Sequence, residues 1–335
     1  MFFHLLFVKQ TLLKTIYHLG GFAPFHRITR GNVLILMYHR FSPERERYKI
    51  SADEFDAHLA YLSKYNRVLS LSDAIENLKN GKSLPPNATI ITIDDGYSDV
   101  YEVAFPILKK YEMPATVYAV TDFLDGKCWL WTDLMRYVLS QTKAENLRIE
   151  FSGGEKIEAN LTGENDRFEI AARINAKLKR LPDEAKNTKI EEIAKSLNVE
   201  IPKLPAQEFA PMSWQQAREM DAQNVKIESH TVTHPILTNI DRARLDDELR
   251  RSKMCLENAL NRKIEHFCYP NGNLNADVRK AVENAGYQSA VTTEYGFNDE
   301  QANQYSLKRI DAAAPIEKFA QSASGFEAFT RKIRN

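Results

Sequence analysis

The sequence predicts an α/β protein, a (β/α) barrel that carries a helical insertion. Three observations predict this fold class: short apolar runs alternate with amphipathic helical patterns, no glycine-rich dinucleotide fingerprint opens the series, and one long stretch breaks the alternation. Strand–helix alternation indicates a parallel sheet with crossover helices. The missing fingerprint favours a closed barrel over an open, nucleotide-binding sheet.

Six runs rich in β-branched and other apolar residues are expected to form buried strands. They are residues 33–38, 89–93, 115–120, 225–228, 266–269 and 289–293. Between the first two strands, Ser51 with Glu54 and Ser70 with Asp73 have the spacing of helix capping boxes. The leucine spacing over 245–260 predicts a longer amphipathic helix.

The stretch 125–211 interrupts this rhythm, because it is rich in Lys, Glu, Asn and Ala and largely helical in pattern. We predict that it is a helical insertion at the barrel rim, acting as a lid or wall. The barrel itself then comprises residues 31–124 and 212–315. Residues 1–30 are expected to form an N-terminal helical segment, and residues 316–335 a C-terminal helical tail.

The bulk composition is that of a soluble globular protein of 335 residues, with 43% hydrophobic and 27% charged residues. Its 45 basic and 45 acidic residues give a formal net charge of +0, so no global field favours nucleic acid, which we exclude as a partner. The three cysteines, Cys128, Cys255 and Cys268, are too few and too widely spaced for a disulfide scaffold or a zinc knuckle.

The first twenty residues begin with an apolar run over 1–8, which Lys9 follows rather than precedes. No small-residue cleavage pattern comes after it, and the run is too short to span a bilayer. These features favour a helix packed on its own domain, with a helix lying on a membrane surface as the alternative. We expect a cytoplasmic protein, or one at the inner face of the membrane with peripheral contact through residues 1–20.

Two pairs of chemically active side chains come at the ends of predicted strands. Asp94 and Asp95 follow the second strand, and His230 and His234 follow the fourth. An Asp-Gly step alone is most often a turn, but strand ends of a parallel barrel are where catalytic groups gather. One carboxylate and two imidazoles are the ligand set of an open catalytic metal site, which leaves the second carboxylate free to act as a base.

The same residues carry a resemblance to a known family. The segment TIDDGY at 92–97 resembles the first motif of the polysaccharide deacetylase family (the NodB-homology domain, carbohydrate esterase family four). SHTVTHP at 229–235 resembles the second motif, and FCYPNG at 267–272 is similar to the third. The resemblance covers residues 33–309 without the insertion. It implies a distorted (β/α) barrel and metal-dependent hydrolysis of acetyl groups, N-acetyl rather than O-acetyl, on a cell-surface or exported polysaccharide or its precursor.

Carried over position by position, the resemblance makes Asp94 the catalytic base and Asp95, His230 and His234 the metal ligands, with metal-bound water as the nucleophile. A backbone N–H of the third motif, at Asn271, would stabilise the charge that develops on the acetyl oxygen. Zn²⁺ suits this ligand set best, although Ni²⁺, Co²⁺ or Fe²⁺ would also bind it.

Two positions depart from the family pattern. The third motif usually supplies an arginine that contacts the base, but Cys268 stands at that position. Arg309, on a later strand, is the candidate replacement; the alternative is that Arg309 is a solvated charge on the surface. No histidine follows His266 to act as the general acid. His39, which follows the first strand, is therefore assigned that role, as in exopolysaccharide-type deacetylases with a rearranged motif order.

Aromatic residues near the motifs are candidates for stacking on sugar rings, and Tyr269 and Trp131 are the stronger ones, although buried core positions are the alternative. Two other functions stay open: a hydrolase of a small non-peptide amide on the same fold, and a carbohydrate-binding protein without turnover. The replacement Asp94→Asn separates them, because a binder should be indifferent to it while a deacetylase should lose its turnover and keep its metal.

Overall fold

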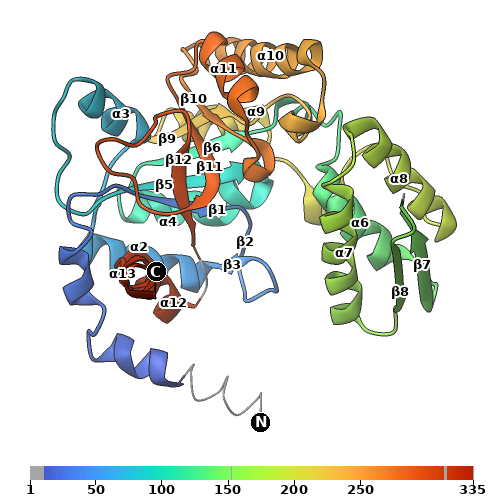
Figure 1. Cartoon of the computed structure of the whole chain (residues 1–335), viewed down its shortest axis with the longest axis horizontal. Helices are drawn as coiled ribbons and strands as arrows, with labels where there is room; N and C mark the ends of the chain where they lie inside the picture. Colours follow the sequence, from blue (N-terminus) through green and yellow to red (C-terminus); the bar gives the residue numbers. More distant parts are fainter. Residues whose placement is uncertain (1–10, 152, 313–314, 335) are drawn as a thin grey trace.

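The computed structural model describes residues 11–151, 153–312 and 315–334, and its centre is a closed parallel barrel (Figure 1). An eight-stranded parallel sheet runs β1-β12-β11-β10-β9-β6-β5-β4, and β5 pairs with β1 as well, which closes seven strands and leaves β4 at the edge. The strands are β1 (Leu34–Tyr38), β4 (Arg67–Val68), β5 (Ala88–Asp95), β6 (Ala115–Ala119), β9 (Val225–Ser229), β10 (His266–Cys268), β11 (Ser289–Tyr295) and β12 (Leu307–Asp311). The barrel predicted from the alternation is confirmed.

The strands differ from the prediction in two ways that matter for the site. β5 extends to Asp95, so that both carboxylates belong to the strand rather than to the turn after it. β12 is a seventh barrel strand that was not among the six predicted, and it joins β11 to β1. Its sequence is Leu-Lys-Arg-Ile-Asp, in which charged residues hide the apolar pattern.

Helices surround the barrel (Figure 1), most of them within the connections between strands and the last two after the final strand. They are α2 (Ala52–Tyr65), α3 (Leu71–Lys79), α4 (Phe105–Lys110), α5 (Thr121–Leu124), α9 (Trp214–Asp221), α10 (Arg242–Leu260), α11 (Ala276–Asn284), α12 (Ile316–Ala323) and α13 (Phe326–Arg334). The shorter helical segments are η1 (Ala23–Arg27), η2 (Val100–Ala104), η3 (Gln207–Phe209), η4 (Leu237–Asn239) and η5 (Pro270–Gly272). The capping box of Ser51 and Glu54 is complete in both directions. Ser70 caps α3 by accepting a hydrogen bond from the N–H of Asp73.

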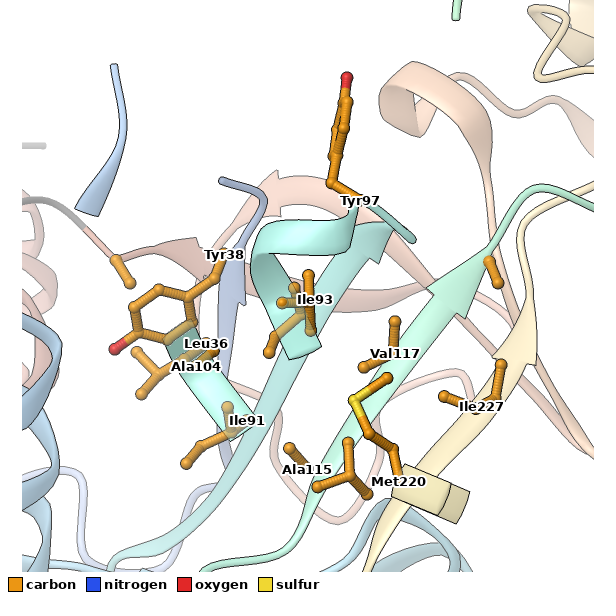
Figure 2. Close-up of a cluster of buried hydrophobic side chains, with 14 of the residues drawn as sticks. Leu36, Tyr38, Ile91, Ile93, Tyr97, Ala104, Ala115, Val117, Met220 and Ile227 are labelled. Atoms are coloured by element: carbon orange, nitrogen blue, oxygen red, sulfur yellow. The ribbon is translucent and has the colours of Figure 1, made fainter. Parts of the chain in front are cut away.

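Two apolar clusters pack against opposite faces of the barrel wall, since successive strand residues alternate sides. Figure 2 shows the outer cluster, in which Ile93 and Val117 on the strands meet helical residues such as Met220. The inner cluster includes Ile90 and Tyr118 of neighbouring strands. The barrel is therefore a filled core whose chemistry can emerge only at the strand ends.

The insertion has its own hydrophobic cluster and is not wholly helical. It contains α6 (Trp131–Gln141), α7 (Glu164–Leu178), α8 (Asp183–Ser196) and an antiparallel hairpin of β7 (Asn146–Glu150) and β8 (Lys156–Asn160). In β7 every second residue is buried and the others are exposed, because the hairpin covers the insertion on one face only. The many charged residues of that exposed face explain why the stretch resembled helix alone.

The N-terminal and C-terminal segments pack on each other beside α2. Residues 11–18 are helical, and the rings of Phe22 and Phe25 contact Phe326 of α13 edge to face at 5.5 and 4.8 Å. Leu12 and Leu19 are exposed. The apolar run over 1–8 lies outside the described residues, and none of the described helices is long and apolar enough to cross a membrane.

Candidate active site

The carboxyl ends of the barrel strands bring the predicted site residues to one cavity of about 1100 Å³. Asp94 and Asp95 come from β5, His39 follows β1, and His230 and His234 follow β9. All five line this cavity, together with side chains of the insertion. Strands that are far apart in sequence meet here because the barrel is parallel and closed.

Asp95, His230 and His234 form a group with the spacing of metal ligands. Oδ1 of Asp95 lies 3.5 Å from Nε2 of each histidine. Bonds of 2.0–2.1 Å in a tetrahedral arrangement would place ligand atoms roughly 3.4 Å apart, so the three atoms fit a zinc-sized ion. Nδ1 of His230 donates to the backbone oxygen of Cys268 at 2.8 Å, which orients the ring and leaves Nε2 for a metal.

Protonation states at this group also suit a metal. Burial lowers the pKa of His230 to about 4, so its ring is neutral and offers a lone pair. Burial, with Asp94 and Asp133 nearby, outweighs His39 and raises the pKa of Asp95 to about 7. A carboxylate in such a place is stabilised by a divalent cation, which would return it to the ionised form.

The histidine loop is held in an unusual backbone conformation. Thr231 and His234 have positive φ angles of 74° and 58°, which non-glycine residues adopt only when their surroundings impose it. Glu248 of α10 supplies that constraint, because its carboxylate accepts hydrogen bonds from the N–H groups of Val232 and Thr233 at 2.8 and 2.9 Å. A buried side chain outside the motifs therefore positions the second histidine.

Glu248→Ala is expected to lower metal affinity by about 10–100-fold, the usual cost of losing a partner that orients ligands. Titration of the metal against a competing chelator measures this. Asp247→Ala is the matched control, since Asp247 is the neighbouring acid on α10, is exposed and pairs only with Arg251 among the described residues. Equal metal affinity in both variants would contradict a positioning role for Glu248.

Asp94 forms a two-pronged ion pair with Arg309. Nη1 and Nη2 of the guanidinium each lie 2.7 Å from one carboxylate oxygen. Arg309 is 1% exposed, which contradicts the solvated-charge alternative. Its remaining donors are bound by Thr292 oxygen at 2.7 Å and Thr92 Oγ1 at 3.0 Å, and Cys268 Sγ lies 3.2 Å from Nη2. Arg309 thus pairs with Asp94, the contact expected of it as the replacement for the third-motif arginine.

Because of this ion pair, the pKa values of the adjacent carboxyl groups of Asp94 and Asp95 shift in opposite directions. Burial alone would raise the pKa of Asp94, but the charge and hydrogen bonds of Arg309 outweigh burial and hold this pKa well below its usual range. His39 lies nearby, with Nε2 3.7 Å from Oδ2 of Asp94 and 42% of its side chain exposed to the cavity. Asp94 and His39 can therefore face the same bound group.

The third motif forms a tight turn at the cavity wall. Asn271 has a φ of 58° and lines the cavity. The next residue, Gly272, has a φ of 75°, and a Cβ there would lie 2.0 Å from Oγ1 of Thr293. Only glycine fits this turn without moving Thr293, so the motif glycine fixes where the Asn271 backbone lies.

The two aromatic candidates do not present open ring faces. Tyr269 lines the cavity but is 0% exposed, and its hydroxyl donates to the backbone oxygen of Tyr305 at 2.9 Å. Trp131 is 4% exposed and belongs to the core of the insertion, where Nζ of Lys186 lies 4.6 Å from its ring. Both rings are therefore buried, Tyr269 in the core of the barrel and Trp131 in the core of the insertion, and neither is exposed at the rim.

Two further residues connect the barrel end to the insertion. The hydroxyl of Tyr97, in the first motif, donates to Asp133 of α6 at 2.5 Å, and the guanidinium of Arg40 lies 3.9 Å above the Tyr97 ring. Arg40 also pairs with Asp99 at 2.6 Å. The sequence marks Tyr97 through the first motif and Arg40 through its place directly after His39, but nothing marks Asp133 within the insertion.

A closed parallel barrel with a buried carboxylate–guanidinium pair and an Asp-His-His group at its strand ends has the parts of a metal-assisted hydrolase. The chain belongs to the polysaccharide deacetylase family, whose family model matches residues 81–202 and 205–290, more than half of the chain. It is therefore a polysaccharide deacetylase, a hydrolase that acts on carbon–nitrogen bonds other than peptide bonds.

Individual proteins show the same likeness. YxkH of Bacillus subtilis strain 168, named for the same family, is 25% identical over 301 residues, which is 90% of this chain and 76% of that protein. The poly-β-1,6-N-acetyl-D-glucosamine N-deacetylase of Staphylococcus aureus strain MSSA476 is 33% identical over 100 residues, 29% of this chain and 34% of that enzyme.

Solved structures share the fold. The deacetylase PplD of Streptococcus pyogenes, solved with acetate, superposes with a TM-score of 0.57 at 22% identity, covering 88% of this chain and 99% of that chain. IcaB of Ammonifex degensii gives a TM-score of 0.54 at 20% identity, covering 87% and 97%. Both likenesses concern the fold.

Proposed function

We propose that the protein removes N-acetyl groups from a cell-surface or exported polysaccharide, or from its precursor. The observation that carries the proposal is the Asp94–Arg309 pair lying directly beside the group of Asp95, His230 and His234. A base and a metal-ligand set at one cavity are the parts that hydrolysis of an unactivated amide requires. The name of the Staphylococcus aureus relative supports an N-acetylated glycan as substrate.

The base is Asp94. A divalent ion, Zn²⁺ in the first instance, would be held by Asp95, His230 and His234, and when bound it lowers the pKa of a water ligand to about 7. Arg309 keeps Asp94 ionised throughout the physiological range, so its carboxylate is present in the form that can accept a proton.

Protonation of the leaving amine is assigned to His39. Its imidazole is partly exposed on the cavity wall and lies near Asp94. The backbone N–H of Asn271, in the turn fixed by Gly272, is the donor for the developing charge on the acetyl oxygen. Both assignments use groups that the barrel places around one opening.

Cavity size favours a glycan over a small amide. Sites for small molecules enclose about 300–1000 Å³, and this cavity of about 1100 Å³ extends from the barrel end to the insertion. A binding protein without turnover would not need a free base, whereas Asp94 is held ionised by a buried arginine. The deacetylase proposal accounts for both features.

Acetate release from β-1,6-linked N-acetylglucosamine oligomers and from an acetylated exopolysaccharide tests the proposal. We expect release by the metal-loaded protein, loss on chelation and recovery when the metal is restored. His39→Ala should lower turnover by about 10²–10⁴-fold with its metal retained, because general acid catalysis is lost. Full activity of His39→Ala would move the general acid elsewhere, and no release from either substrate by the metal-loaded protein would refute the function.

A further inference from the structure

We propose that Tyr48, braced by Phe168 of the insertion, forms a sugar-binding subsite distal to the reacting acetyl group. This inference rests on the proposed function and deepens it, because it makes the substrate an oligomer that must reach the loop between β2 (Phe41–Ser42) and β3 (Ile50–Ser51). The subsite is defined here as Tyr48 and Phe168 together with the cavity wall beside them.

Exposure singles out Tyr48 among the aromatic rings of the cavity. The other three, Tyr38, Tyr97 and Tyr269, are 2%, 3% and 0% exposed, and their hydroxyls are bound within the protein. Tyr48 lines the same cavity and is 51% exposed. A sugar ring stacks its apolar C–H face on an accessible aromatic face, and of the described cavity rings this is the one that offers it.

The ring is held rigidly although it is exposed. Its centroid lies 3.6 Å from that of Phe168, with the two planes inclined by only 6°, so one face is covered. The guanidinium of Arg136 lies 4.7 Å from the Phe168 ring, and that of Arg47 lies 5.0 Å from the Tyr48 ring. A platform fixed in this way loses little entropy when a ligand binds.

The backbone at Tyr48 supports a functional reading. Its φ of 66° is unfavourable for a bulky residue, and such outliers persist where the surroundings impose them, often at ligand clamps. The Phe168 stack and an ion pair of Arg47 with Glu169, at 3.0 Å, tie this loop to α7. The barrel loop and the insertion thus build the subsite jointly.

Position makes the subsite distal. Figure 1 shows the β2–β3 connection on the side of the barrel that faces α7, where Tyr48 stacks on Phe168, whereas Asp94 is the last residue but one of β5. Of the α6 residues that line the cavity, Arg136 lies beside the Phe168 ring and Asp133 accepts a hydrogen bond from Tyr97 of the first motif. A chain whose N-acetyl group meets Asp94 would therefore extend toward Tyr48, which gives the insertion a role in recognising substrate length.

Variants at Tyr48 test the subsite, because losing it should change KM for an oligomer and leave kcat unchanged. Tyr48→Ala should raise KM for a β-1,6-linked hexamer of N-acetylglucosamine by about tenfold, as expected for losing one stacking contact, and leave kcat unchanged. The KM for the monomer should not move, because one sugar cannot span both places. Tyr48→Phe keeps the ring and should behave as the wild type, and Phe168→Ala should fall between them.

Binding measured without turnover separates this inference from the proposed function. Calorimetric titration of the hexamer into Asp94→Asn, and into Asp94→Asn with Tyr48→Ala, should show the same tenfold weakening. If the wild type releases no acetate but this difference in binding remains, the subsite stands and the deacetylase function fails. Equal hexamer affinity with and without the Tyr48 ring, or no binding of the hexamer to Asp94→Asn, would overturn the subsite.

Discussion

Asp94→Asn is expected to lower turnover for acetate release by about 10²–10⁴-fold, the usual contribution of a positioned general base, and to leave the bound metal in place. An amide cannot accept the proton that a carboxylate takes. The group proposed to hold the metal consists of Asp95, His230 and His234, so the stoichiometry of bound metal should stay at the wild-type value. Acetate release and metal content are measured on the same samples.

Stability must be followed in this experiment, because the substitution also unpairs Arg309, which is buried. Asp221→Asn is the matched control: it is the same substitution at another buried aspartate that binds an arginine, Arg262, with Oδ1 2.5 Å from Nη2. We expect the control to lose stability and to keep its turnover. If Asp94→Asn retained turnover within threefold of the control, Asp94 would not be the base.

The barrel could be predicted from the sequence because six of its seven strands lie in short runs rich in β-branched and other apolar residues, and helical patterns separate these runs. β12 was not among these six runs, because only Leu307 and Ile310 of its five residues are apolar, and a later strand was expected there only through the role assigned to Arg309. A fully buried arginine is intelligible only when its partner is known, and Asp94 lies more than two hundred positions away. The formation of this strand depends on its tertiary pairing, about which the local sequence pattern carries no information.

The candidate site likewise contains residues that the sequence indicates and residues that only the folded structure brings to notice. That the four residues of the two motifs lie at one cavity could be predicted, because both motifs come at the ends of parallel strands; their roles as base and metal ligands stay predictions. Glu248 and Asp133 were not, since each acts through a hydrogen bond to a residue from another element. Trp131 was chosen as a rim residue, but an aromatic at the start of an insertion has the same sequence pattern whether it packs inside or reaches over the cavity.

Arg309→Met is expected to destabilise the protein by about 3–5 kcal/mol at neutral pH, because it leaves a buried carboxylate without its cation. The pH dependence has a definite sign. In the wild type the pKa of Asp94 lies below its unfolded value of about 3.9, so the ion pair stabilises the fold above that pH and the contribution is lost as pH falls through the folded-state pKa. Without Arg309, burial governs and raises the pKa instead.

When the pKa of Asp94 is higher in the folded state than in the unfolded state, the folded state takes up the proton first on acidification. The Arg309→Met variant therefore becomes more stable, relative to the wild type, as the pH falls. The difference in unfolding free energy between wild type and Arg309→Met should therefore be widest at neutral pH and narrow by about pH 4, as denaturant titrations at the two values would show. The acid limb of the pH–rate profile should shift to higher pH in parallel. Arg309→Lys keeps the charge but not the two-pronged geometry and should lie between the two. A stability difference that is equal at both pH values would show that Arg309 acts through packing and does not set the ionisation of Asp94.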